Sequence, residues 1–541
     1  MNPASQQTDS PVALAVVKDR AASLPAGARA TTAARLARWL RAHRWWCAVA
    51  VLYLYCFPYY PKIHSANELP RAYLVKAIVD HGTFAIDDGV QRWGATADCS
   101  PSRGHQYSNK APGSSLLAVP VYALAKLVSG SEPSLATTMW LCRVTTGILP
   151  TLLLLLMLQV FLRRFSDEPT TVRVVLVAYA LGSMAMTYSV LFISHQLSAV
   201  CMGAGWIFLA DGNRDSFRKF VWGGLLLGAA PLVDYQAVFA GVPLGIWLIW
   251  RVWSWPRRDA LRAIALAAVA AAVPLAVLLG YHAVCFGSPW KTGYDASEAF
   301  AHFHQQGFLG ITKLRGVAFI GSTFSGDNGL FTLAPWLLLT LSGLVLLWRR
   351  GDRAVAVVSA SILLIYLLFI SSINFWRGGW CLGPRYITVM LPFLLPAAVV
   401  ALDSARKYPP LLAAGLAAVI VAVTVYSLSN ALFPHFPERF GNPLYDVTFA
   451  LFLDGAAAPN VANLVGLSGT LSLLPYLLLL IGLVVVTVRA AARSHAVLGG
   501  AAVLALLVVL AYQWFPRANV ESKQAYRDYV LGVMPPPHPL W

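Results

Sequence analysis

The sequence predicts an all-α polytopic membrane protein with about thirteen transmembrane helices and a large first external loop containing amphipathic interfacial helices. Of its 541 residues, 58% are hydrophobic and only 12% are charged, and the mean hydropathy is +0.62. This composition excludes a soluble globular protein. Apolar runs of roughly 20 residues, which cross about 30 Å of hydrocarbon as helices, recur along the chain. They lie in residues 45–60, 136–162, 174–191, 196–211, 219–233, 236–251, 262–285, 330–348, 354–372, 386–402, 410–429, 471–489 and 496–515.

The placement of positive charge supports this series of spans. Lys and Arg concentrate in short cytoplasmic loops, and each span reverses the side of the membrane. The net charge of +17 therefore reports topology and an attraction to anionic membrane lipid. Aromatic and basic residues do not interleave, so we expect no nucleic-acid partner. With the N-terminus inside, the cytoplasmic groups are Arg35 to Arg44, Arg163-Arg164, Arg214 to Lys219, Arg251 to Arg262, Arg349 to Arg353, Arg406-Lys407 and Arg489 to Arg493.

Composition divides the chain further. Residues 1–34 are rich in Ala, Ser and Thr, which predicts a disordered cytoplasmic tail. Residues 35–44 predict a basic interfacial helix, and the amphipathic segment 114–130 predicts a second helix in the outer interface. Residues 45–430 form the main transmembrane region, and 431–541 form a C-terminal transmembrane region with an external tail. The external segments are 61–113, 286–329, 373–385, 430–470 and the chain after Phe515.

The seven cysteines are an odd number, which argues against a disulfide framework. Cys99 and Cys381 both fall on the outer side, where an oxidising compartment would allow them to pair. Buried free thiols are the interpretation that we favour.

Two polar stretches of the first external loop predict the active site. Ser65-Ala66-Asn67-Glu68-Leu69-Pro70-Arg71 opens the loop, and Tyr107-Ser108-Asn109-Lys110-Ala111-Pro112-Gly113 closes it. Together they hold a carboxylate, a lysine and aromatic residues at one membrane face of a mostly apolar protein, where polar groups are expensive to keep. The outer loops also carry Trp, Tyr, His, Asp and Glu, which are typical of recognition of a polar substrate.

These stretches resemble the GT-C superfamily of integral membrane glycosyltransferases, within it the branch of protein mannosyltransferases and aminoarabinose transferases. The resemblance covers most of residues 45–430 and implies about thirteen spans and an acidic catalytic residue in the first loop, here Glu68. It also implies that Lys110 contacts the lipid phosphate of the donor. Further similar stretches are Phe286 to Tyr294, Gly329 to Phe331 with Ala334 to Trp336, and Trp376 to Tyr386.

The chemistry of sugar transfer gives these residues their expected roles. Transfer from a polyprenyl-phosphate-linked sugar needs a base for the proton of the acceptor hydroxyl, a role that suits Glu68. It also needs cations where charge develops on the departing phosphate, a role that suits Lys110 and Arg385. A single carboxylate without a covalent partner implies direct displacement with inversion. We expect this reaction at the outer face of a bacterial cytoplasmic (inner) membrane, in assembly of the cell envelope, with a glycan, lipid or protein acceptor.

Each assignment has an alternative. Glu68 is also placed to pair with Arg71, three residues on, and Lys110 to snorkel to the interface. Asp87, Asp88 and Asp98 share the first loop, so a divalent metal is possible there, although no compact ligand motif occurs. Arg143 and Asp234 lie at outer ends of spans, and Asp234 is placed to bind a sugar or an arginine. His195 and His282 lie near other outer ends, and for these histidines we favour snorkelling to the interface. The possible substrate-binding residues are Asn67, Asp98, Tyr107, Asp234, Trp376 and Arg377.

Two other functions also fit a polytopic protein with polar outer loops. A transporter or flippase of a lipid-linked sugar would hold its ionisable groups near the bilayer midplane, often between two repeated halves. No internal repeat is visible, and the ionisable residues gather at the outer face. A non-catalytic scaffold is the remaining alternative, because fold alone does not specify function.

Overall fold

The structure, a computed structural model, describes residues 44–60, 67–438 and 440–533. The predicted tail at 1–34 and nearly all of the predicted basic helix at 35–44 lie outside these residues, so neither prediction is tested.

The chain divides into two units, Met1–Cys47 and Ala48–Trp541, and the description below concerns the second. Within residues 44–60, 67–438 and 440–533, eight helices are long and apolar enough to cross a membrane, or up to nine if one pair bent by 50° is a single span, which agrees with the predicted all-α polytopic class. The predicted number of thirteen is not confirmed. Several predicted spans are shorter helices, such as those at His195–Asp211 and Arg218–Val233.

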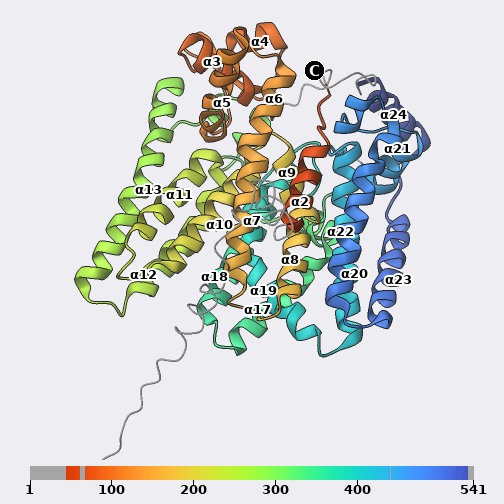
Figure 1. The fold of residues 1–541 in the computed structure, drawn as a ribbon. Coiled ribbons are helices and arrows are strands. Elements are labelled where there is room, and N and C mark those ends of the chain that lie inside the picture. The colour runs from red at the N-terminus through yellow and green to blue at the C-terminus, as the bar shows by residue number, and fades with distance from the viewer. Residues whose placement is uncertain (1–43, 61–66, 439, 534–541) are drawn as a thin grey trace, which may run out of the picture. The chain divides into compact units, whose positions relative to one another are not determined.

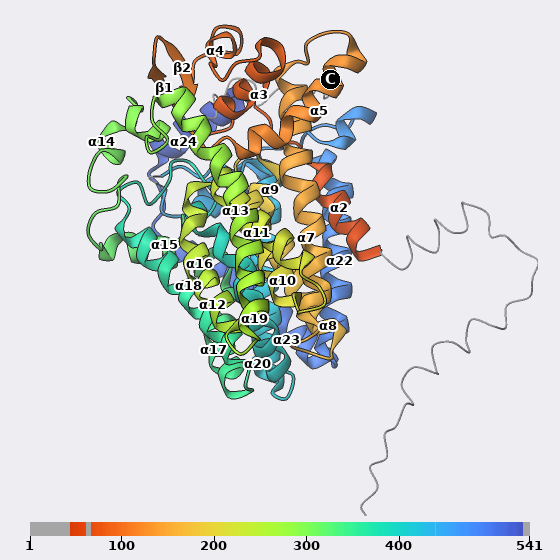
Figure 2. The ribbon, with the colours of Figure 1, turned by 90° about the vertical axis from the view of Figure 1, so that its left-hand side faces the viewer.

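The helices of the transmembrane region run side by side in both views (Figures 1 and 2). Before the first loop lies α2 (Arg44–Tyr55). After the loop follow α6 (Leu135–Arg143), α7 (Leu149–Leu162), α8 (Pro169–Leu181), α9 (Met184–Val190), α10 (His195–Asp211), α11 (Arg218–Val233), α12 (Val238–Val252) and α13 (Arg257–Phe286). Next are α14 (Ala301–His304), α15 (Gly316–Phe324), α16 (Leu330–Leu333), α17 (Leu339–Arg349), α18 (Arg353–Ser372), α19 (Leu391–Ala405) and α20 (Pro409–Leu432). The C-terminal helices are α21 (Phe449–Leu453), α22 (Leu474–Ala492), α23 (His495–Ala511) and α24 (Val520–Val533).

Small residues allow some of these helices to approach closely. Gly224 and Gly228 lie one turn apart on α11, and a Cβ added to them would come within 2.1 Å of the Ala267 carbonyl oxygen and 2.2 Å of the Ala271 carbonyl oxygen on α13. The backbones of α11 and α13 are therefore in direct contact, as is usual where small residues repeat at every fourth position of membrane helices.

The first loop is an ordered structure at one end of the helices (Figures 1 and 2). Its elements are α3 (Leu69–His81), α4 (Asp87–Trp93), the antiparallel strands β1 (Cys99–Ser102) and β2 (His105–Ser108), and α5 (Gly113–Ser129). α3 starts with a proline in its first turn and ends at Gly82, whose φ of 64° is the left-handed conformation that favours glycine. α5 matches the segment predicted at 114–130, although its place at a membrane interface stays a prediction.

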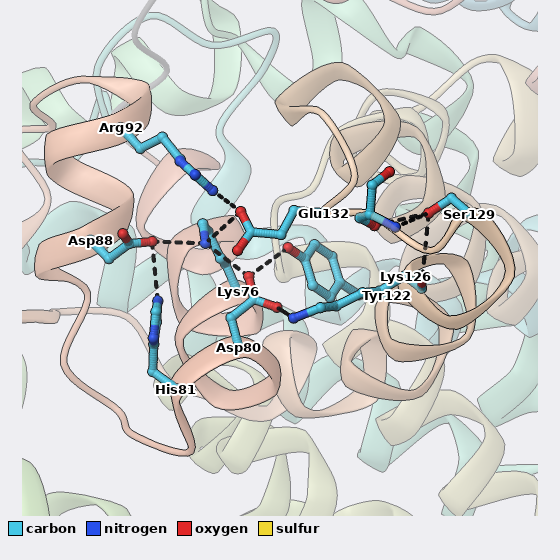
Figure 3. Close-up of polar contacts among 10 residues, drawn as sticks. Lys76, Asp80, His81, Asp88, Arg92, Tyr122, Lys126, Ser129 and Glu132 are labelled. Atoms are coloured by element: carbon cyan, nitrogen blue, oxygen red, sulfur yellow. Dashed lines mark hydrogen bonds and ion pairs between the residues drawn. The ribbon is translucent and has the colours of Figure 1, made fainter.

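A network of ion pairs ties α3 to α4 and α5 (Figure 3). The Lys76 ammonium is buried and lies 2.8 Å from Asp80 and 2.7 Å from Asp88. Asp80 also pairs with Lys126 at 2.7 Å, and Glu132 pairs with Lys76 at 3.3 Å. Because a buried ammonium is tolerated only with partners, this network fixes the helices of the loop relative to one another.

Aromatic residues pack α24 onto the segment that follows α20. Tyr526 packs against Phe433 and Phe440, and Trp380 contacts Tyr526 and Tyr529.

All seven cysteines lie in the described residues and are free, so Cys99 and Cys381 do not pair in this structure.

Candidate active site

A short hairpin brings Asp98 and Lys110 together. Cys99 of β1 pairs with Ser108 of β2, so the residues beyond this pair are also adjacent, and the Asn109 N–H donates to the Asp98 carbonyl at 3.3 Å. Lys110 follows at once, and its Nζ lies 2.9 Å from Asp98 Oδ1. Both side chains are buried. The hairpin therefore holds a carboxylate and an ammonium in contact inside the protein.

Tyr294 contacts this ammonium from a second segment. Its ring centre lies 5.2 Å from Lys110 Nζ. The preceding Gly293 fits closely on the hairpin, because a Cβ there would come within 2.4 Å of Asn109 Cα. Burial lowers the pKa of Lys110 to about 8, with Asp98 opposing this shift and the positive charge of Arg71 adding to it. The Lys110 ammonium is therefore poised to lose or keep its proton close to neutral pH.

Arg71 and Arg385 add two further buried cations. Arg71 of α3 donates to Ser194 Oγ at 2.8 Å and also to Asn67. Arg385 lies over the ring of Tyr386, with 5.3 Å from its Cζ to the ring centre. Among the described residues neither guanidinium forms an ion pair with a carboxylate, and the Nε of each has no hydrogen-bond partner. Since a buried cation without a counter-charge is costly, the pair is suited to an anionic ligand.

The cations line two adjacent cavities. The larger has a volume of about 470 Å³ and contains Asp98, Lys110 and Arg385 in its wall. The smaller, of about 20 Å³, shares Lys110 and Arg385 with it and adds Arg71 and Asp234. Aromatic rings cover much of the larger cavity and offer faces to a sugar or an isoprenoid chain. They include Tyr294, Phe300, Phe303, Phe375, Trp380 and Tyr386.

Glu68 lies outside both cavities. It is buried, and its two carboxylate oxygens each accept a hydrogen bond of 2.9 Å from the Arg143 guanidinium. The Phe192 backbone N–H donates to the same carboxylate at 2.6 Å. The alternative partner Arg71 was wrong, because Arg143 takes that place. A carboxylate whose two oxygens both bind one arginine is held in a fixed place, so this geometry favours a structural role.

Asp234 pairs with a histidine rather than with an arginine. Its Oδ2 lies 2.5 Å from His195 Nδ1, and both side chains are buried in the wall of the smaller cavity. His195 begins α10, and Asp234 ends α11, so the tight packing of these helices brings the two together. The interpretation of His195 as a snorkelling residue was therefore wrong. His282 instead contacts the Tyr235 hydroxyl at 2.9 Å.

The remaining predicted residues separate into two groups. Asn67 lines both cavities. Tyr107 belongs to the apolar core, with its ring 6.0 Å from that of Phe286. Trp376 covers Gly321 of α15, and Arg377 pairs with Asp327. Tyr107, Trp376 and Arg377 are absent from the described walls of the two cavities, so their predicted contact with substrate is not supported by this geometry.

The three candidate metal ligands lie in separate ion pairs. Asp87 pairs with His105 at 3.0 Å, Asp88 with Lys76 at 2.7 Å, and Asp98 with Lys110 at 2.9 Å. Within the described ranges no group of three or more His, Cys, Asp or Glu residues is arranged to hold a metal ion. The first loop therefore does not bring these carboxylates into one site.

Sequence reasoning missed Arg71 as a cavity residue, together with His195, Tyr294 and Tyr386. Arg71 lies four residues after Asn67, which is one helical turn, so the periodicity of α3 was a usable signal. Tyr294 and Tyr386 lie in stretches that the sequence singled out. His195 was singled out as an ionisable residue near the outer end of a span, but only the packing of α10 against α11 shows its partner.

Comparison with solved structures gives three similarities. The chain is similar to ArnT from Cupriavidus metallidurans in the apo state, with 17% identity, a TM-score of 0.47 and coverage of 88% of this chain and 77% of that chain. It is similar to ArnT bound to undecaprenyl phosphate, with 17% identity, a TM-score of 0.45 and the same 88% and 77% coverage. It is also similar to the apo oligosaccharyltransferase of Archaeoglobus fulgidus, with 11% identity, a TM-score of 0.45 and coverage of 78% of this chain and 58% of that chain.

All three structures are less than 25% identical to this chain. At TM-scores below 0.5 they assign no role to any residue. No protein-family model matches the chain, and no curated protein sequence matches it.

Proposed function

We propose that the larger cavity is the active site of a membrane glycosyltransferase that moves a sugar from a polyprenyl-phosphate-linked donor to an acceptor. The observation that carries the proposal is the group of three buried cations, Arg71, Lys110 and Arg385, beside the carboxylate of Asp98. Arginine and lysine are the side chains that bind phosphate most effectively, through forked and point-charge contacts respectively. The class of lipid is that found with ArnT, undecaprenyl phosphate.

The proposed reaction is a single displacement. The acceptor hydroxyl attacks the anomeric carbon, the bond from that carbon to the phosphate oxygen breaks, and the polyprenyl phosphate departs with the bonding electrons. The three cations stabilise the charge that develops on the phosphate. The acceptor proton passes to a carboxylate. One displacement inverts the configuration at the anomeric carbon.

We propose Asp98 as the carboxylate that receives the proton. Its side chain lines the larger cavity beside Lys110, whereas Glu68 lies outside it in the contact with Arg143. A donor phosphate bound there would give Lys110 a second anion to contact beside Asp98. Glu68 as the base stays a prediction that the same experiment tests.

The proposed reaction takes place at the outer face of a bacterial cytoplasmic membrane. In both views the first loop lies at one end of the helices, and the connections from α12 to α13 and from α17 to α18 lie at the other (Figures 1 and 2). Arg257 begins α13 and Arg349 ends α17, directly beside these connections. The positive-inside rule then puts the first loop outside. The acceptor is a glycan, lipid or protein.

Release of undecaprenyl phosphate tests the proposal without knowledge of the acceptor. Lipid-linked sugars from the source membranes are added to membranes that contain the wild type, Asp98→Asn, Glu68→Gln or Asp87→Asn. Asp87→Asn is the matched control, because its carboxylate lies in the exposed pair with His105. We expect Asp98→Asn to release undecaprenyl phosphate about a hundred- to ten-thousandfold more slowly, and Asp87→Asn to match the wild type.

Two outcomes would contradict the proposal. Normal release by Asp98→Asn, together with no release by a folded Glu68→Gln, would return the base to Glu68. Movement of the lipid-linked sugar across a proteoliposome membrane, with no release by the wild type, would favour the transporter instead.

A further inference from the structure

His195 and Asp234 form a buried pair that the proposed displacement does not use. Their side chains meet at 2.5 Å through Nδ1 and Oδ2. An ionised carboxylate only accepts hydrogen bonds, so the imidazole proton lies on Nδ1 and the lone pair on Nε2. Among the described residues Nε2 has no hydrogen-bond partner although it is buried. Because buried polar atoms are nearly always paired, this nitrogen lacks the contact that a purely structural histidine would have.

The surroundings of His195 decide what Nε2 can bind. The rings of Tyr188 and Tyr386 pack edge-on against the imidazole, with centres 5.5 and 5.7 Å away. The Tyr188 hydroxyl donates to the Leu382 carbonyl instead. Burial lowers the pKa of His195, the contact with Asp234 opposes this shift, and the positive charges of Arg385 and Arg71, which line the same cavity, add to it. A neutral imidazole with its proton on Nδ1 offers an acceptor at Nε2, so it suits a hydroxyl and repels a phosphate oxygen.

The cavity beside His195 and Asp234 has room for one hydroxyl group. The smaller cavity has a volume of about 20 Å³, which is room for about one oxygen atom. It shares Asn67, Lys110 and Tyr294 with the larger cavity, so a group bound there would belong to a molecule whose bulk occupies the larger one. Lys110 and Arg385 line both cavities, and Arg71 lines the smaller one.

We propose that His195 and Asp234 recognise the donor sugar: Nε2 of His195 accepts a hydrogen bond from one sugar hydroxyl, while Asp234 holds the imidazole in the required tautomer. This inference rests on the proposed function, because it takes the larger cavity to hold a sugar linked to a lipid phosphate. In this proposal His195 and Asp234 select the sugar, whereas Arg71, Lys110 and Arg385 bind the phosphate of the lipid.

The test compares binding of two kinds of lipid to the purified protein in nanodiscs. One is undecaprenyl phosphate, and the other is undecaprenyl phosphate carrying glucose, mannose or arabinose, whichever the wild type binds most tightly. His195→Asn is the informative variant, because the Asn amide can still donate to Asp234 but has no group at the position of Nε2. We expect it to bind the sugar-linked lipid about five- to twentyfold more weakly, the loss of one hydrogen bond, and to bind undecaprenyl phosphate normally.

His105→Asn is the matched control, because His105 makes the same Nδ1 contact to a carboxylate, Asp87, at an exposed position 3.0 Å away. It should bind both lipids normally. An equal loss of both lipids in His195→Asn, or no loss of either, would overturn the role of the pair. If the wild type bound undecaprenyl phosphate tightly and none of the three sugars increased that affinity, the role of the pair would also be overturned. The proposed phosphate site would then still stand. Failure of the wild type to bind either lipid would remove the proposed function and this inference together.

Discussion

Lys110 lies in an unusual environment for a lysine, because its side chain is buried. It is buried against Asp98 and Tyr294 and faces the positive charges of Arg71 and Arg385. Burial is the main reason that its pKa falls to about 8. The ammonium is therefore present below about pH 8 and is lost above it, whereas the two arginines keep their charge at all these pH values.

Binding of undecaprenyl phosphate should accordingly weaken as the pH rises. The ligand is an anion throughout this range, so its affinity should fall between pH 7 and pH 9 as Lys110 loses its proton. Lys110→Arg should bind with an affinity that is nearly independent of pH, since a guanidinium does not titrate there. Titrations of the lipid at several pH values check this. An identical pH profile for the wild type and Lys110→Arg would show that another group titrates.

The sequence predicted Glu68 as the catalytic base, and the structure pairs its carboxylate with Arg143. Its ion pair with Arg143 is buried on both sides, and removal of one partner leaves the other charge uncompensated. We expect Glu68→Gln to lower the free energy of unfolding by about 3–5 kcal/mol, whereas Asp87→Asn, which removes an exposed pair with His105, should lower it much less. Thermal unfolding in detergent measures both. A Glu68→Gln protein as stable as the wild type would argue that Glu68 is free to act on substrate.

Lys110 and Glu68 both lie in stretches that the sequence predicted for the active site, but only Lys110 lines the two cavities. Lys110 and Arg385 line the cavities as their position in outer loops suggested. The partner of Glu68 is 75 residues away in the chain, and no local pattern contains that contact. The alternative pairing of Glu68 with Arg71 was wrong, because Arg71 donates to Ser194 and Asn67 instead.

At the scale of the elements, the contact between α11 and α13 depends on two glycines. A methyl group at Gly224 would overlap the Ala267 carbonyl oxygen, with 2.1 Å between them. We expect Gly224→Ala to separate the two helices and to cost about 1–3 kcal/mol of stability. Gly280→Ala on α13 is the control, because a Cβ there meets nothing within 4 Å. Equal unfolding temperatures for the two variants would contradict this packing.

The elements of the membrane region were easier to predict than those of the first loop. Apolar length identifies a helix that must hydrogen-bond its own backbone in lipid, and α18, α20 and α22 lie where that rule placed them. The ends of α10 and α11 also lie within one residue of the predicted spans 196–211 and 219–233, although both helices are too short to be counted among the candidate spans. The hairpin that joins Asp98 to Lys110 has only four residues in each strand, too few to give a visible alternation.

At the scale of the whole molecule, the proposal requires the first loop and the connection between α7 and α8 to lie on opposite sides of the membrane. The charge pattern puts the connection inside. Single cysteines introduced at Ser131 and at Asp167, which are both exposed, test this orientation in intact cells. Labelling of the native cysteines in the wild type gives the background signal. An impermeant reagent should label the cysteine at 131 and not that at 167. Labelling of 167 alone would reverse the proposed orientation.

The central claim concerns the place of the lipid phosphate. A cryo-EM structure of the protein in nanodiscs with undecaprenyl phosphate tests it most directly, with Arg377 as an internal comparison because that arginine already pairs with Asp327. We predict the phosphate oxygens at about 2.7–2.9 Å from the nitrogens of Lys110 and Arg385, with Arg71 on the side of the smaller cavity. A phosphate bound beside Arg143 or Arg377, with these three cations unliganded, would contradict the account.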